Sequence, residues 1–317
     1  MGILNRRHLR IKVLQALYAY FQSDEDNYVR AEKDLVNSIE KMYDLYLYLL
    51  LTYGEVRDIA LHRIEENKKK LRPTEEDLHP NRKFVDNEII ESLENSAELR
   101  KKSEERKINW LGDENKEMFR KMFLAIKESE TYIHHMNVQD RDFEEEKTFA
   151  IDVFKNEIAN FELLHNFFEE KSIQWLDDID LVCSMVIKTI KQMENGEGFK
   201  LLPLYKEDDD EQEFIRELFK KTVSMNFSNE KLIDELTENW ELERIAKMDI
   251  ILMKMAVTEL QIFPSIPTKV TLNEYIEISK FYSTPKSNGF INGILDKAID
   301  RLTKEGLIRK TGRGLMQ

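Results

Sequence analysis

The sequence contains few of the residues that interrupt helices. Its 317 residues include only 10 glycines and 6 prolines, whereas leucine, glutamate and lysine are abundant. Proline breaks a helix interior and glycine weakens one, and domains built of many short strands need both residues in their turns. We therefore expect an all-α protein.

Cysteine and long apolar runs are also scarce. The single cysteine, Cys183, excludes an internal disulfide and suits a reducing compartment; since no motif surrounds it, we interpret it as a buried, unreactive thiol. The most apolar run, residues 45–53, is too short for a bilayer span, which needs about 20 residues. Arginines and a histidine replace the apolar part of a signal peptide near the start. We expect a soluble, cytoplasmic protein without membrane contact.

The patterns of common catalytic and cofactor sites are missing as well. There is no phosphate-binding G-x-x-x-x-G-K-[ST], no G-x-S-x-G, no H-E-x-x-H and no Cys-x-x-Cys. His134 and His135 are adjacent and would point to different faces of a helix. The acidic runs 144–146 and 208–210 lack the spacing of a calcium loop. We therefore expect no catalytic residues, no cofactor and no metal site.

Negative charge dominates the chain but not its ends. The net charge is −13, yet residues 1–23 carry four bases and no acid, and residues 301–317 carry five bases and one acid. An acidic body repels nucleic acid, so any RNA contact should be confined to the two basic ends and should weaken with salt.

The amino-terminal end predicts a basic helix. Asn5 is a suitable N-cap, and apolar residues recur at helical spacing to about Gln22. Arg6, Arg7 and Arg10 lie in the first two turns, where the helix dipole disfavours cations. Either these arginines are solvated or paired locally with acids, or they bind an anion.

The middle of the chain, residues 24–206, is acidic and has helical patterns throughout. One long helix is expected over residues 34–63 and another over residues 86–106, and no repeat period is visible. The block is either an insertion or an extended amino-terminal region. We assign residues 1–23 to the basic helix, 24–206 to this acidic block, 207–310 to a carboxy-terminal core and 311–317 to a basic tail.

The carboxy-terminal core centres on a helix over residues 242–263. It is apolar over most of its circumference, which predicts a central place in a bundle. Pro264 and Pro267 end it. Thr271 and Glu274 have the spacing of a capping box, so we expect the next helix to begin directly after Thr271.

A break at residues 283–287 separates that helix from the last one. The last helix has an apolar face from Ile291 to Leu302 and contains Gly289 and Gly293. Glycine in a helix interior costs about 1 kcal/mol relative to alanine. The pair therefore predicts close approach by another backbone or by a ligand.

Three stretches, together about a third of the chain, have a recognisable pattern. They are R-R-x-x-R-x-x-x-L-Q-A-L-Y at residues 6–18, I-A-K-M-D-I-I-L-M-K-M-A-V-T-E-L at residues 245–260, and P-T-K-V-T-L-N-E-Y-I-E-I-S-K followed by S-T-P-K-S-N-G-F-I-N-G-I-L-D at residues 267–296. They resemble the NusB family of bacterial transcription antitermination factors. The order of the three stretches is that of the family.

The resemblance implies a NusB-like helical bundle, here with a large additional helical region. It also implies a factor that binds boxA-type single-stranded RNA together with the ribosomal protein NusE, within an antitermination complex of RNA polymerase. Such RNA is held by cations at phosphates and by aromatic or amide groups at bases. The RNA-binding residues it implies are Arg6, Arg7, Arg10, Gln15, Tyr18, Lys286, Ser287, Phe290 and Asn292.

Some of these assignments have alternatives. Tyr18 and Phe290 are equally compatible with core positions. The resemblance implies that NusE contacts Asp249 and Glu259; ordinary helix surface or pairing inside the bundle would also explain these two residues.

Two other functions remain open from the sequence. A NusB-like domain also precedes the catalytic domain of a ribosomal RNA cytosine methyltransferase, but no alternating strands and helices follow Leu302. Under this alternative, the chain is a stand-alone relative of the RNA-binding domain of that enzyme. Alternatively, the protein is a non-catalytic helical scaffold for protein partners.

Overall fold

The computed structural model describes residues 4–23, 27–138, 142–197, 199–205, 210–237, 245–285 and 287–315. Every regular element in these ranges is a helix, and they contain no strand, so the all-α prediction is confirmed. Among the described residues no helix combines the length and the apolar character that crossing a membrane requires.

The chain forms two compact units. Unit 1 comprises residues 40–204, and unit 2 comprises residues 2–39 and 205–317. Residues 27–39, which the sequence analysis grouped with the acidic block, therefore cluster with the basic helix and the carboxy-terminal residues. The finer division of the chain into four segments stays a prediction.

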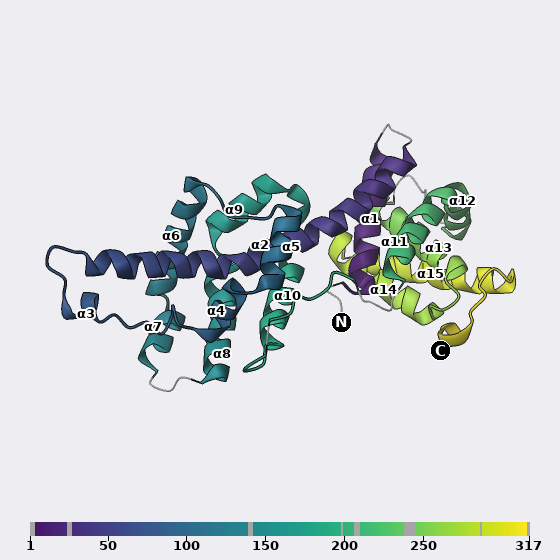
Figure 1. Cartoon of the computed structure of the whole chain (residues 1–317). Helices are drawn as coiled ribbons and strands as arrows, with labels where there is room; N and C mark the ends of the chain where they lie inside the picture. Colours follow the sequence, from purple (N-terminus) through teal and green to yellow (C-terminus); the bar gives the residue numbers. More distant parts are fainter. Residues whose placement is uncertain are drawn as a thin grey trace. The chain divides into compact units, whose positions relative to one another are not determined.

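Unit 1 is built from short helices around most of one long helix (Figure 1). Its elements are α2 (Tyr28–Lys68, from residue 40), α3 (Glu75–Leu78), α4 (Glu88–Glu94), α5 (Ala97–Arg106), α6 (Asp113–Glu128), α7 (Glu130–Asn137), α8 (Phe143–Val153), a π-helical turn (Phe154–Ile158), α9 (Glu162–Lys171), a 3-10 turn (Ile173–Trp175) and α10 (Ile179–Lys191).

Aromatic rings form much of the core of unit 1. Tyr48 lies 4.8 Å from Trp110 and 5.8 Å from Trp175, ring centre to ring centre, and both contacts are edge-on. Edge-on contacts suit the charge distribution of aromatic rings. The Trp110 indole also donates to the Tyr48 carbonyl at 3.1 Å. These contacts attach the segments after α5 and α9 to α2.

The sequence predicted the helices of unit 1 better than their ends. The helix expected over residues 34–63 is confirmed and is longer, as α2. The helix expected over residues 86–106 is wrong as one element, because α4 and α5 are separate. Ser96 starts α5, and its Oγ accepts from the Leu99 amide at 3.1 Å. Serine competes for backbone amides in this way and so favours a cap over a helix interior.

The surroundings of the single cysteine and of the two adjacent histidines fit structural roles. Cys183 is half-buried rather than fully buried as predicted, and this burial raises the pKa of its thiol to about 12, which keeps it protonated. His135 is buried with its Nδ1 2.7 Å from the Glu145 carboxylate, and its ring stacks on Phe149, whereas His134 is exposed. The two histidines do face different sides, as predicted.

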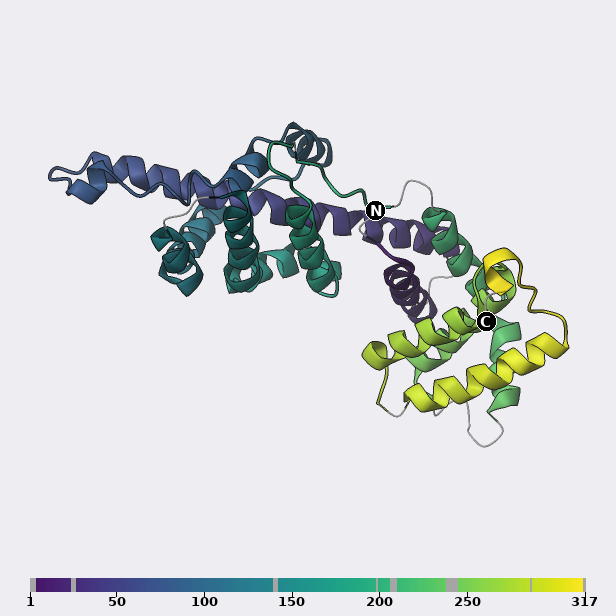
Figure 2. The ribbon, with the colours of Figure 1, turned by 90° about the horizontal axis from the view of Figure 1, so that it is seen from below.

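Unit 2 is a bundle around one central helix. Its elements are α1 (Arg6–Gln22), α11 (Glu211–Ser224), α12 (Asn226–Leu236), α13 (Lys247–Ile262), α14 (Thr268–Tyr282), α15 (Ser287–Lys304) and a 3-10 turn (Gly312–Leu315). Unit 2 also includes the start of α2, up to residue 39. Helix α13 contacts α1, α11, α12, α14 and α15 and is buried on nearly every side, which confirms its predicted central place. Figure 2 shows the chain in a second view. The expected start of this helix at residue 242 lies outside the described residues.

The ends of α1 and α14 show where local patterns succeed and fail. Asn5 caps α1 as predicted, since its side chain accepts from the His8 amide at 3.0 Å. The predicted start of α14 after Thr271 is wrong, because the helix begins at Thr268, directly after Pro267. Thr271 and Glu274 do not cap α14, since both side chains bind residues of other helices.

A buried ion pair joins α1 to the central helix. The Arg10 guanidinium donates to both carboxylate oxygens of Glu259, at 2.7 Å each, and their side chains are 2% and 0% exposed. The Thr271 and Tyr275 hydroxyls donate to the same carboxylate at 2.9 and 3.1 Å. Arg10 also lies over the Phe214 ring of α11, 5.3 Å from its centre. One carboxylate thus connects α1, α13 and α14.

The direction of α1 follows from its contacts. Arg7 pairs with Glu274 and Gln15 meets Tyr282, and both contacts have a sequence separation of 267 residues. An equal separation means that α1 and α14 run in parallel. The contacts of α1 with α13 run the opposite way, from Arg10 at Glu259 to Gln22 at Lys247.

The basic tail is attached to the turn after α13. The Thr311 amide donates to the Pro264 carbonyl at 2.9 Å, and the Lys310 ammonium to the Phe263 carbonyl at 3.0 Å. A side chain at Gly314 would clash with the Pro264 carbonyl, 1.9 Å from the position of its Cβ. Glycine is therefore required at this close approach.

We predict that Arg10→Met destabilises unit 2 strongly, because it leaves the buried Glu259 carboxylate without its cation. Breaking a buried pair in this way typically costs about 3–5 kcal/mol. Arg7→Met is the matched control: it removes the half-exposed pair with Glu274, which should cost about 1 kcal/mol or less. Urea denaturation followed by circular dichroism measures both, and similar losses for the two variants would contradict the prediction.

A second prediction concerns Glu55 on α2. Burial, aided by the nearby Asp58 and Glu94 carboxylates and opposed by Lys116, raises the pKa of Glu55 to about 7. The unfolded chain titrates near 4.3, so the stability that this group contributes is full below that pH and is lost as the pH rises through 7.

Glu55→Gln should therefore raise the melting temperature at pH 8 but change it little near pH 4. The gain at pH 8 should be about 1 kcal/mol, since solvent screens a half-buried group. Glu65→Gln, which removes an exposed acid bonded to Lys68 on the same helix, is the control and should bring no gain at pH 8. A gain from Glu55→Gln that is equal at both pH values would refute the assignment.

Candidate functional site

The three arginines of α1 have three different environments. Arg6 is half-buried, with its guanidinium 4.9 Å from the centre of the Phe214 ring. The Arg7 side chain is 41% exposed and donates to both oxygens of Glu274, at 2.9 and 2.8 Å, which raises the pKa of Arg7. Arg10 is buried on Glu259. Arg6 and Arg7 therefore reach the surface, whereas Arg10 does not.

The next turns of α1 bring polar and aromatic groups beside the end of α14. The Gln15 amide lies 3.5 Å from the Tyr282 hydroxyl, and Tyr18 is 38% exposed. Tyr18 therefore lies at the surface and not in the core. The parallel pairing of the two helices places Arg7 two turns before Gln15 on the side of α1 that faces α14.

The turn between α14 and α15 is closed by its own hydroxyl groups. Ser283 donates to the Asp249 carboxylate of α13, and the Thr284 and Ser287 hydroxyls lie 2.8 Å apart. The Ser287 amide donates to the Thr284 carbonyl at 2.9 Å. Ser287 is buried, so its amide and hydroxyl serve the turn in this structure. Lys286 lies outside the described residues.

The remaining predicted RNA-binding residues lie on α15. Phe290 and Asn292 are both half-buried, and the Asn292 amide lies 3.4 Å from the Asp296 carboxylate. Gly289 and Gly293 are exposed, and among the residues that the structure describes nothing lies within 4 Å of a Cβ built on either. The predicted close approach of another backbone is therefore wrong, since both glycines face open space.

Both residues for which NusE contacts were predicted are buried. Asp249 is 3% exposed and accepts from Ser283, and Glu259 is 0% exposed and accepts from Arg10, Thr271 and Tyr275. The alternative of pairing inside the bundle describes them both. Neither carboxylate is placed where a partner protein would touch it directly.

Phe281 is a further exposed aromatic residue, and it was not among the predicted site residues. This phenylalanine is 79% exposed and directly precedes Tyr282, the residue that meets Gln15. The available signal was its position off the apolar stripe of α14, which contains Tyr275 and Ile278. A large aromatic residue outside the buried stripe of a helix has to lie at its surface.

Comparisons with known proteins point to one family. The family model described as "NusB family" matches residues 180–300. A protein named transcription antitermination protein NusB from Salinibacter ruber is 42% identical over 110 residues, which are 35% of this chain and 69% of that protein.

Two further relatives carry the same name. The one from Natranaerobius thermophilus is 36% identical over 92 residues, 29% of this chain and 66% of the relative. The one from Chloroherpeton thalassium is 47% identical over 79 residues, 25% of this chain and 37% of the relative. No solved structure matches the chain. With the Salinibacter relative matched over more than two thirds of its length, the chain belongs to the NusB family.

Proposed function

We propose that this protein is a transcription antitermination factor that binds boxA-type single-stranded RNA together with the ribosomal protein NusE. The name of the relatives supports antitermination. The observation that carries the RNA-binding part is the parallel pairing of α1 with α14, which places Arg7 at Glu274 and Gln15 at Tyr282, with the exposed Tyr18 three residues further along α1. Single-stranded RNA needs this combination of cations, amides and aromatic rings.

The proposal gives the residues of unit 2 distinct roles. Arg6 and Arg7 bind phosphates, whereas Gln15 and Tyr18 bind bases. Arg10 is a positioning residue, because it fixes α1 on α13 from inside the bundle. Phe281 adds an exposed ring for stacking.

The other proposed contacts lie after α14. Lys286 binds a phosphate, and Phe290 and Asn292 extend the RNA path along the start of α15, whereas the buried Ser287 holds the turn before them. Asp249 holds the turn between α14 and α15 by accepting a hydrogen bond from Ser283. Glu259 holds α1 in place through Arg10. NusE binds unit 2, and the assembly acts beside RNA polymerase in the cytoplasm.

Arg7 must change its partner when RNA binds. Its guanidinium donates to both Glu274 oxygens, so a phosphate competes with this carboxylate. Exposed ion pairs are weak, about 0–1 kcal/mol, so the exchange is accessible. Glu274 thereby tunes RNA affinity without touching RNA.

This exchange predicts opposite effects of two substitutions on the affinity for a boxA oligonucleotide. Arg7→Gln should weaken binding by about tenfold and reduce the slope of log K against log salt by about 0.7, the value of one phosphate contact on a single strand. Glu274→Gln should tighten binding severalfold, because Arg7 loses its competing acid. Fluorescence anisotropy titrations at several salt concentrations measure both quantities.

Arg216→Gln is the matched control. Arg216 lies on α11 of the same unit, is 50% exposed and pairs with one oxygen of Glu32 at 3.0 Å. It should leave the affinity and the slope unchanged. A near-zero salt slope that Arg7→Gln does not alter would favour the scaffold function over RNA binding.

Assembly with NusE gives a separate prediction. Labelled boxA RNA should bind more tightly when NusE and this protein are present together, because each then adds contacts to the same strand. Titrations with and without NusE test this. Equal affinities in the two titrations would argue against joint binding while leaving RNA binding by this chain intact.

A further inference from the structure

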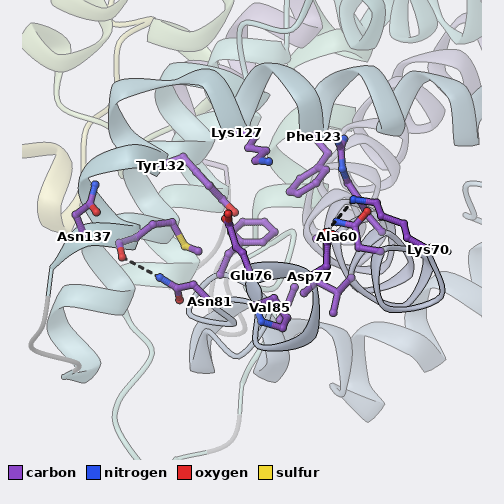
Figure 3. Close-up of a pocket in the computed structure, with 16 residues that line it drawn as sticks. Ala60, Lys70, Glu76, Asp77, Asn81, Val85, Phe123, Lys127, Tyr132 and Asn137 are labelled. Carbon is purple, nitrogen blue, oxygen red and sulfur yellow. Dashed lines mark hydrogen bonds and ion pairs between the residues drawn. The ribbon is translucent and has the colours of Figure 1, made fainter. Parts of the chain in front are cut away.

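Unit 1 contains a cavity of about 520 Å³ that the family comparison does not cover (Figure 3). Helix α2 lines it with Ala60, Arg63 and Asn67, whose spacings of three and four residues place them on one helix face. Helix α6 adds Phe123 and Lys127, again four residues apart. All of the lining precedes residue 180, where the match to the family model begins.

The inner wall of the cavity is aromatic. Phe84 and Phe123 are buried, and the half-buried Tyr132 of α7 lies 5.5 and 6.4 Å from them, ring centre to ring centre. In Figure 3 Tyr132 reaches toward the middle of the cavity, with Lys127 above it and Glu76 below it. Its ring therefore offers a stacking surface for a flat ligand.

The charges at the cavity differ from those of the unit around it. Unit 1 carries 36 acidic and 25 basic residues, yet the cavity lining has three bases and two acids. Lys70 and Asp77 neutralise each other at 2.8 Å. Arg63 and Lys127 are exposed at the cavity, and no ion pair to either is found within the described part of the chain. Such a local excess of positive charge favours an anion.

One side-chain amide of the lining, that of Asn81, already makes hydrogen bonds within the protein. The Asn81 side chain donates to the Met136 carbonyl at 3.0 Å and accepts from the Lys83 amide at 3.0 Å. Asn67 has both a donor and an acceptor to offer. A ligand that needs stacking, a two-sided amide contact and an anion site is a nucleotide.

We infer that this cavity binds a nucleoside monophosphate unit, either free or as part of an RNA strand. The base stacks on Tyr132 and meets Asn67, and the phosphate lies at Arg63 and Lys127. A volume of about 520 Å³ is within the range of ligand pockets, about 300–1,000 Å³. This site is separate from the proposed boxA contacts, all of which lie in unit 2.

Calorimetric titration of the full-length chain tests the inference. The probes are the four nucleoside monophosphates, the corresponding nucleosides, inorganic phosphate and a short oligonucleotide without a boxA sequence. Arg63→Ala combined with Lys127→Ala should weaken nucleotide binding at least tenfold and leave nucleoside binding unchanged. Tyr132→Leu should weaken both. Because Arg63 and Lys127 are exposed, their removal should not alter the melting temperature.

The control is Lys68→Ala combined with Arg120→Ala. These cations lie on the same two helices, pair with Glu65 and Glu117, and do not line the cavity, so the total charge changes equally. Binding of the oligonucleotide without binding of any mononucleotide, lost only in the cavity double variant, would identify a strand as the source of the nucleotide.

Three results would overturn the inference. They are absence of binding by every nucleotide probe, equal loss in the cavity and control variants, and displacement of nucleotide by inorganic phosphate at equal concentration. The two proposals can be tested independently. Arg7→Gln should weaken boxA binding and leave mononucleotide binding unchanged, so that either proposal can fail without the other.

Discussion

The arrangement of unit 2 depends on the buried pair between Arg10 and Glu259. A buried carboxylate is costly unless hydrogen bonds surround it, and Glu259 accepts from Arg10, Thr271 and Tyr275, which belong to two helices beside its own. The contact that compensates the buried charge thereby fixes the register of α1. If Arg10 is fixed, Arg7 lies one turn earlier and Gln15 more than one turn later, both beside α14.

The same pair explains which parts of the site could be predicted from sequence. Helical spacing and Asn5 were sufficient for α1, because cap and stripe are local signals. The capping-box spacing of Thr271 and Glu274 was misleading, because the residues that decide their role, Arg7 and Glu259, are distant in sequence. Likewise nothing local distinguishes Arg7 from Arg10, since both lie on one face of α1 and only the position of a buried acid separates them.

The features that were not predicted differ in how much of their environment a local sequence pattern can indicate. Gly289 and Gly293 break a propensity rule, but their surroundings are open, so a rule about helix energetics could not reveal what faces them. Phe281 carried a usable signal, its place off the apolar stripe. The cavity of unit 1 carried none, because Arg63, Lys127 and Tyr132 come from three helices that only the folded chain brings together.

Charge distribution decides how the two proposed sites can work. Unit 2 carries 23 basic and 25 acidic residues, so most of the net charge of −13 belongs to unit 1. Charges more than about 8 Å apart are largely screened at physiological salt. Exposed cations on α1 are therefore not outweighed by the acidity of the whole chain. In unit 1 the excess of positive charge at the cavity is small, because Glu76 lines it together with Arg63 and Lys127, so these two cations alone would select phosphate poorly. Affinity there has to come from the aromatic wall as well, which is why a nucleotide fits that cavity better than a simple anion does.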